Sequence, residues 1–427
     1  MATVPLVALV SLLSPFIRLA ETENFRSIFR FLRCYTHSYL LCNLSPPCPH
    51  FHLDRAPDIL LSIVLTNYSV FIIFSTMFSE VILAMLAAGA QASPLRHVPR
   101  GWNSTVSDPI SILNQTSLPS QLNNAKNWDI KLAIQQDFPD PAIWNTGKSW
   151  YAFSTSSHGV NTQVATSNDF KHWNVLAGHD ALPTPGSWTL QGAPGIWAPD
   201  VFRNNKGQYV LYYAGTLASS TAHHCIGIAT SDNVEGPYVD HNPNPAVCPL
   251  SAGGAIDPAH FRDSDGTRYM VYKIDGNSIG HGGDCNNGVA PIVSTPIMLQ
   301  QMEHDGITPV GAPVQIMTNQ NSDGPLVEAP SLSLTVDGQY MLLFSSGCYT
   351  NPNYNTKYAL ANHVKGPYVR GGAPLWQSGS DSMLSPGGAD AAHNGKHVAF
   401  HSSNLDGTRS MYTAILHVNG NKVDAFH

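Results

Sequence analysis

Residues 253–273 read GGAIDPAHFRDSDGTRYMVYK, and this stretch contains the pattern that organises the chain. Asp257 is followed by proline, a short apolar step and the turn residues 263–266. An aromatic and β-branched run, 269–272, follows the turn. Two such runs around an Asp-Gly turn are typical of a β-hairpin. The stretch therefore predicts two antiparallel strands, with Asp257 at the start of the first.

The same pattern occurs four more times along the chain. When the copies are aligned on the tyrosine of the second strand, the residue twelve positions earlier is Asp257, Glu328 or Trp197. A shorter copy starts at Asp140, and a degenerate copy spans residues 386–400. The second strands recur at intervals of roughly 60 residues, which suits four-stranded propeller blades better than a helical solenoid. We therefore predict an all-β fold, a five-bladed β-propeller.

Equivalent positions of successive blades face one central axis, so this alignment displays three carboxylates around one pocket: Asp140, Asp257 and Glu328. Trp197 fills a fourth equivalent position. Asp-Pro and Asp-Gly pairs also open ordinary turns in β proteins, which is the structural alternative for any single copy. Three acids in one register favour a functional site.

The first part of the chain lacks this pattern. Residues 1–76 carry apolar tracts and three cysteines, and we assign no domain to them; a mis-assigned gene start would explain them. Residues 77–92 are interpreted as a signal peptide that ends in Ala-Gln-Ala. A longer leader that uses residues 59–74 as a membrane anchor is the alternative. Residues 93–129 are predicted to be an exposed lead-in, and residues 130–427 the propeller.

A mature protein that begins near Ser93 is expected to be secreted and extracellular. Asn103 and Asn114 each open an Asn-x-Thr sequence, and they become glycosylation sites only on that route. Cleavage before Ser93 leaves four cysteines, which can all pair. Neighbouring placement suggests Cys225 with Cys248 and Cys285 with Cys348, although four cysteines allow three connectivities.

Composition narrows the class of protein. Only 12% of the residues are charged, the net charge is −7, and the chain contains 34 Gly and 31 Pro. This describes a loop-rich β domain with a mildly acidic surface, so nucleic acid is not expected as a partner. We also expect a monomer, with no membrane contact in the mature form. The nineteen histidines show no spacing of a metal site.

Three carboxylates around one pocket are the equipment for acid-base cleavage of a glycosidic bond. The sequence has no zinc motif and no Gly-rich phosphate loop. One carboxyl must be protonated to protonate the leaving oxygen, and another must be ionised to activate water. The longer Glu328 suits the acid role, and we expect the two aspartates to remain anionic, since crowded like charges raise the pKa of one member.

Four motifs resemble those of glycoside hydrolase family 43, in the same order: DPAIW at Asp140, WAPDV and YVLYY in 197–213, AIDP at Asp257 and VEAPS at Glu328. The resemblance covers residues 130 to the C-terminus. It implies a five-bladed propeller and an inverting hydrolase of arabinose- or xylose-containing plant polysaccharides. It further implies that Asp140 is the general base, Glu328 the general acid, and Asp257 the residue that modulates the pKa of the acid and orients it.

The resemblance differs in the last blade. Many family members carry a His after Pro-Gly that belongs to a central calcium site, whereas Gly388 stands there in this chain, and His393 is a poor substitute by position. We therefore predict that no cofactor is required, keep a central calcium ion as the alternative, and assign no metal ligand. Trp197 is a candidate substrate-binding wall for a sugar ring, with core packing as the alternative. Asp200 and His260 are predicted to be hydrogen-bonding supports.

Three alternatives remain open. A carbohydrate-binding propeller without activity explains the fold and the aromatic residues, but not why Glu and Asp share one repeat position. A retaining transferase needs its two carboxyl groups about 5 Å apart, against about 6.5–9.5 Å for inversion. Among the hydrolases, α-L-arabinofuranosidase is the first choice by family frequency, with β-xylosidase and endo-arabinanase as the alternatives.

Overall fold

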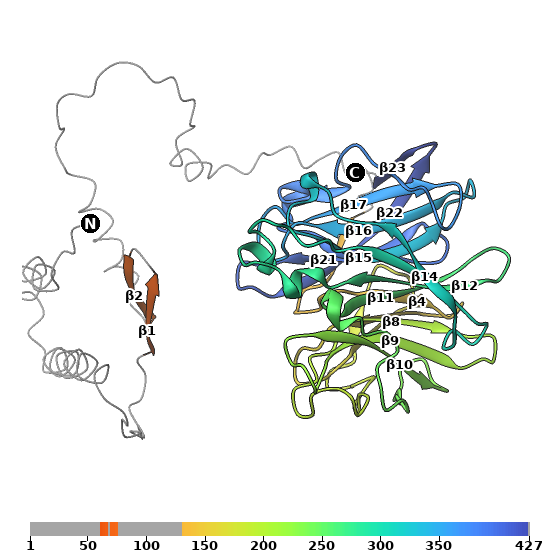
Figure 1. The fold of residues 1–427 in the computed structure, drawn as a ribbon, viewed down its shortest axis with the longest axis horizontal. Coiled ribbons are helices and arrows are strands. Elements are labelled where there is room, and N and C mark those ends of the chain that lie inside the picture. Colours follow the sequence, from red (N-terminus) through yellow and green to blue (C-terminus); the bar gives the residue numbers. More distant parts are fainter. Residues whose placement is uncertain (1–59, 67–68, 76–129, 426–427) are drawn as a thin grey trace, which may run out of the picture. The chain divides into compact units, whose positions relative to one another are not determined.

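The computed structural model describes residues 60–66, 69–75 and 130–425 (Figure 1). The first two segments, β1 (Leu60–Thr66) and β2 (Ser69–Ser75), pair as an antiparallel hairpin. They overlap residues 59–74, which the sequence analysis gave as the alternative membrane anchor. The predicted signal peptide and both predicted glycosylation sites lie outside the described residues. Within the described residues, no helix is long and apolar enough to cross a membrane.

Residues 130–425 form five antiparallel sheets, which confirms the predicted all-β fold. Blade 1 contains β4 (Ala142–Asn145), β5 (Trp150–Ser154), β6 (Gln163–Ser167) and β7 (Asn174–Val175). Blade 2 contains β8 (Trp197–Arg203), β9 (Tyr209–Thr216) and β10 (His224–Ser231). Blade 3 contains β11 (Ala255–Arg262), β12 (Arg268–Ile274), β13 (Ile297–Met302) and β14 (Pro309–Met317).

Blade 4 contains β15 (Val327–Leu334), β16 (Tyr340–Ser346), β17 (Asn355–Ala361), β18 (Val369–Arg370) and β19 (Trp376–Gln377). Blade 5 contains β20 (Gly387–Ala391), β21 (His397–Ser403), β22 (Arg409–Asn419) and β23 (Lys422–Ala425). Short 3-10 helices lie in the loops: η2 (Leu250–Ala252), η3 (Gly276–Ile279), η4 (Asp284–Asn286), η5 (Asn321–Asp323) and η6 (Ser380–Ser382).

The five sheets close into a ring, the predicted five-bladed propeller. The inner strands touch in the order β4, β8, β11, β15, β20 and β4 again. In Figure 1 successive sheets follow the colour series, from the green β8, β9 and β10 to the blue β16, β17 and β22. Strand β3 (Lys131–Ile134) pairs with β22, so a strand from the start of the domain completes the last blade.

The core lies between adjacent blades, because each sheet buries both faces against its neighbours. Phe153 of blade 1 packs with Tyr213 of blade 2, and Phe261 of blade 3 packs with Phe344 of blade 4. All four side chains are buried. Side chains on both faces of a blade therefore pack against the neighbouring blades. The ring holds the loops of the blades in fixed positions.

Four of the inner strands have the same backbone irregularity, a β-bulge, near their first residues. The register shifts between Trp197 and Asp200 in β8, between Ile256 and Ala259 in β11, and likewise in β15 and β20. In each shift, the first residue that is left unpaired has a positive φ, and so does Asp140 just before β4. These residues are Asp140, Ala198, Asp257, Ala329 and Gly388. These bulges bend the strand starts at the centre of the ring.

This geometry corrects the predicted alignment. Gly266, Gly207 and Gly338 are equivalent turn residues, so Arg268, and not Tyr269, corresponds to Tyr340. Asp140 and Asp257 therefore share the positive-φ position, whereas Glu328 and Trp197 stand one residue before it. The prediction that three acids share one position was wrong, because an arginine precedes the tyrosine in the second strand of blade 3 and shifts the count by one.

Both suggested disulfides are present, which confirms the pairing. Cys225–Cys248 ties β10 to the segment that runs beside it in blade 2. Cys285–Cys348 joins η4, in the β12–β13 loop, to the residue that follows Gly347 after β16. The second disulfide therefore connects the loops of blades 3 and 4.

Candidate active site

Residues at the positive-φ positions and just after them line a narrow axial cavity. Its volume is about 40 Å³, and its lining includes Asp140, Asp257, Ala329 and Gly388. A space of this size accommodates about one water molecule. Glu328 is absent from the lining because it stands one residue earlier than Ala329. The structure thus brings Asp140 and Asp257 to the axis and holds Glu328 beside it.

Asp140 is held in its ionised form. Arg409 donates from Nη1 to Oδ1 and Oδ2 at 3.1 and 3.4 Å, and Thr155 donates its hydroxyl to Oδ2 at 2.8 Å. Burial alone raises the pKa of the Asp140 carboxyl, but the Arg409 charge and the contacts of His401 and Thr155 outweigh it and hold the pKa well below its usual range. The group is therefore anionic across the neutral and mildly acidic range.

His401 supports Asp140 from β21. Its Nδ1 accepts the backbone N–H of Asp140 at 3.1 Å and lies 3.1 Å from the Asp140 Oδ1. Burial lowers the pKa of the imidazole, because its charged form loses hydration. The imidazole is therefore neutral at neutral pH, and it fixes the Asp140 backbone through this hydrogen bond.

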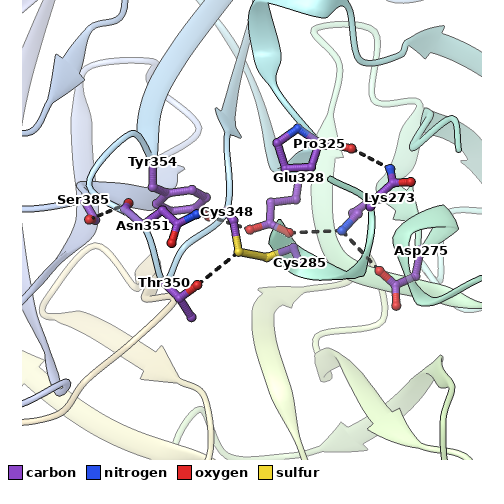
Figure 2. The surroundings of a disulfide bond; sticks show 11 residues. Lys273, Asp275, Cys285, Pro325, Glu328, Cys348, Thr350, Asn351, Tyr354 and Ser385 are labelled. Carbon is purple, nitrogen blue, oxygen red and sulfur yellow. Dashed lines mark hydrogen bonds and ion pairs between the residues drawn. A yellow bond between two sulfur atoms is a disulfide. The ribbon is translucent and has the colours of Figure 1, made fainter. Parts of the chain in front are cut away.

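Glu328 lies between a tyrosine and a buried lysine (Figure 2). Tyr354 donates its hydroxyl to Oε1 at 2.8 Å, and Lys273 donates Nζ to Oε2 at 3.0 Å. Lys273 also lies 3.2 Å from the Asp275 Oδ1. Burial lowers the pKa of the Lys273 ammonium, but the charges of Glu328, Asp275 and Asp257 raise it by more. The ammonium therefore stays charged in a fully buried position.

Asp257 differs from the predicted anionic state. Burial and the neighbouring Glu328 charge raise the pKa of its carboxyl to about 8, against the opposing effect of Lys273. Its Oδ2 accepts the backbone N–H of Ala329 at 2.8 Å. Asp257 therefore carries a proton at neutral pH while it anchors the backbone beside Glu328.

Sequence reasoning missed four residues of this site: Lys273, Tyr354, His401 and Arg409. Lys273 left a signal, because a charged residue follows the apolar and aromatic run 269–272 within a strand. Arg409 lies 269 positions from Asp140 and Tyr354 lies 26 from Glu328, and neither belongs to the repeated pattern. Only the closing of the ring brings Arg409 to Asp140.

Two aromatic side chains are exposed on loops and strand starts near these acids. Trp197 is 39% exposed and stacks on His224, with ring centroids 3.5 Å apart. Tyr349 is 46% exposed, and the Arg409 guanidinium lies 5.1 Å from the centre of its ring. Trp197 therefore presents a ring face to solvent rather than to the core.

Asp200 accepts the backbone N–H of His260, as expected for a hydrogen-bonding support.

The calcium site that the family resemblance implies does not fit these residues. Among the described residues, no group of three or more His, Cys, Asp and Glu side chains is placed to hold a metal. A Cβ at Gly388 would lie 2.7 Å from the His401 Nδ1 and 3.0 Å from the Asp140 Oδ1, so no His fits there without movement. His393 is exposed in the β20–β21 turn, at the other end of β20.

Comparison with known proteins places this site in context. The family model for glycosyl hydrolases family 43 matches residues 132–413. The chain is 28% identical over 268 residues to extracellular endo-α-(1→5)-L-arabinanase 1 of Bacillus subtilis (strain 168), covering 59% of this chain and 76% of the arabinanase. It is 28% identical over 246 residues to a xylan 1,3-β-xylosidase of Vibrio sp., covering 54% and 40% of the two chains.

Solved structures agree on the fold. A thermostable family-43 glycoside hydrolase superposes with a TM-score of 0.58 at 22% identity, covering 69% of this chain and 95% of that chain. A family-43 endo-arabinanase from Bacillus licheniformis superposes with a TM-score of 0.53 at 25% identity, covering 70% and 99% of the two chains. The similarity spans the five blades.

Proposed function

The chain belongs to glycosyl hydrolases family 43, and we propose from this membership that it hydrolyses arabinofuranosyl linkages of plant polysaccharides with inversion. Relatives named as endo-arabinanases support arabinan as the substrate. They favour cleavage within the chain over the α-L-arabinofuranosidase activity expected from family frequency. A relative named as a xylan 1,3-β-xylosidase keeps β-xylosidase as the second candidate.

The observation that carries the proposal is the contrast in charge around two acids. Asp140 faces a guanidinium and is held ionised, as a general base requires. Glu328 lies in a cluster in which one ammonium serves three carboxylates, so that cluster retains a proton at neutral pH. We assign the general-acid role to Glu328 and the modulating role to Asp257. The raised pKa of Asp257 keeps a proton next to Glu328.

The proposed reaction is a single displacement. Asp140 accepts a proton from water while the water oxygen bonds to the anomeric carbon. The bond from that carbon to the leaving oxygen breaks, and Glu328 gives its proton to this oxygen. The axial cavity is too small for a sugar ring, so the substrate would bind at its mouth, where Trp197 offers a ring face. No step uses a metal.

The test is a substrate panel followed by proton NMR of the first product. We expect release from linear arabinan and an aryl α-L-arabinofuranoside, with the β-anomer of arabinose formed first. Release from the aryl β-xyloside alone would overturn the arabinose assignment. A retained anomer would indicate the transferase-like mechanism instead. A wild-type protein that binds arabinan without cleaving any panel member would establish the binding propeller.

We also propose that the protein is secreted, with Ser93 as the first mature residue. Relatives named as extracellular support this proposal. N-terminal sequencing of secreted material tests it, and residues from before Met77 in that product would favour the longer leader.

A further inference from the structure

We propose that a cavity beside Glu328, outside the axial site, is a second carbohydrate subsite that binds the neutral sugar chain on the leaving-group side. The cavity has a volume of about 530 Å³, within the range of small-molecule sites. It lies between the loops of blades 3 and 4. This inference rests on the proposed hydrolase function and specifies where the substrate extends.

The lining comes from three loops: residues Asp284, Asn287, Gly288, Ile292 and Ser294 of the β12–β13 loop, residues 319–325 before β15 (except 322 and 323), and Asn353 before β17. Asn287 is buried and fixes the floor, since its Nδ2 donates to the Pro325 carbonyl at 2.6 Å and to the Val293 carbonyl at 2.9 Å. The Cys285–Cys348 disulfide joins two of these loops. The cavity walls are therefore held in place before a ligand binds.

Residues close in sequence to Glu328 and to its partner Tyr354 line the cavity. Pro325 lines it and stands three residues before Glu328, a distance of at most about 10 Å along the chain. Asn353 lines it and directly precedes Tyr354, which donates to Glu328. Figure 2 draws Pro325, Glu328 and Tyr354 around the same disulfide.

In contrast, neither Thr155 nor Arg409, which hold Asp140, lines the cavity. In an inverting displacement, water attacks from the side opposite to the leaving group, and the general acid must reach the leaving oxygen. The groups bonded to that oxygen therefore extend on the Glu328 side, toward this cavity.

The chemistry of the lining selects the ligand class. Besides the buried Asn287, four amide side chains line the cavity, and amides carry both the donors and the acceptors that match sugar hydroxyls: Asn319, Gln320, Asn321 and Asn353. The lining contains no Lys or Arg, and its one charged residue is the acidic Asp284, so an anionic ligand would be repelled. Ile292 is 46% exposed and offers an apolar contact for one face of a sugar. A neutral pentose or hexose chain fits these groups.

The test compares long and short substrates in the Asn321→Ala/Asn353→Ala double variant. Both side chains are exposed, so their truncation leaves the core intact. The measured quantity is kcat/KM for a linear arabino-oligosaccharide divided by kcat/KM for an aryl arabinofuranoside. Losing the hydrogen bonds of two amides should lower this ratio by about tenfold or more. Asn233→Ala, an exposed Asn that does not line the cavity, is the matched control.

Calorimetry with the same neutral oligosaccharide and with a uronate-bearing analogue separates this inference from the proposed function. We expect the neutral chain to bind more tightly, and the double variant to bind it more weakly. If the wild type cleaves nothing but shows this pattern, the subsite stands and the hydrolase proposal fails. If the wild type cleaves arabinan but the double variant matches the control, the subsite is overturned. Equal affinity for both chains would overturn the assigned ligand class.

Discussion

The two sides of the site pair a carboxylate with a cation in different ways. On the base side, the Arg409 guanidinium, 19% exposed, contacts Asp140 alone among the acids of the site. On the acid side, the fully buried Lys273 ammonium contacts Glu328 and Asp275 and lies under the influence of Asp257. One positive charge therefore balances one carboxylate on one side and is shared by three on the other.

This difference explains how one small site can hold an ionised Asp140 and a protonated Asp257 together. A balanced pair lowers the pKa of its carboxyl, whereas a surplus of buried negative charge is relieved by binding a proton. The proton is retained by Asp257, whose pKa is raised to about 8. The division of roles depends on the number of charges on each side rather than on whether the residue is Asp or Glu.

The largest effect is expected on the base side. Asp140→Ala removes the proposed general base, and a general base contributes about 10²- to 10⁴-fold. The loss should be equally large on arabino-oligosaccharides and on activated aryl glycosides, because both need water. Steady-state kinetics on both substrates provide the check. Full activity of this variant on the oligosaccharide would show that the base lies elsewhere.

On the acid side, the effect should depend on the leaving group. Glu328→Ala should lower cleavage of an oligosaccharide by about 10²- to 10⁴-fold, since a sugar oxygen needs a proton to leave. An aryl glycoside with an acidic phenol should lose distinctly less. Measuring kcat/KM across a series of phenols tests this, and an equal loss on every phenol would assign Glu328 a different role. Thermal unfolding of both alanine variants provides the folding control.

The charge surplus on the acid side can be removed by Asp257→Asn. The wild-type kcat/KM should fall as the pH rises through about 8, because the raised pKa of Asp257 marks the loss of the shared proton. An amide cannot hold that proton, and it removes one of the three carboxylates that share the Lys273 ammonium. The alkaline limit should therefore move to lower pH, by about one unit or more. An unchanged pH profile would contradict the coupling.

The smallest effect concerns the hydroxyl that contacts Glu328. Tyr354→Phe removes one hydrogen bond to a carboxylate, which should lower kcat by roughly tenfold on an oligosaccharide. Tyr368→Phe is the matched control, because its hydroxyl donates to the Val364 carbonyl at 2.9 Å, away from the site. Both variants should lose similar stability in denaturant unfolding. If kcat falls equally in the two, Tyr354 has only a structural role.

The repeated pattern around Asp257 was sufficient to predict five blades and acids around the axis, where the structure places Asp140 and Asp257. The neighbouring placement of the cysteines suggested both disulfides. These predictions succeed because a strand, a turn and a strand of fixed length form a local unit, and each unit buries its alternate residues in the same way. The register within the blades was predicted one residue off for Glu328, since a count from aromatic residues cannot detect the strand positions set by the turn glycines.

Only the tertiary structure decided the protonation states of Asp140 and Asp257. Arg409 reaches Asp140 because β3 and β22 close the ring between residues far apart in the sequence. Tyr354 is set beside Glu328 by a loop that a disulfide joins to blade 3. A pKa depends on burial and on charges within a few ångströms, and these distances are set by packing between blades. The sequence therefore determined which acids are present, and the closed ring determined which of them holds a proton.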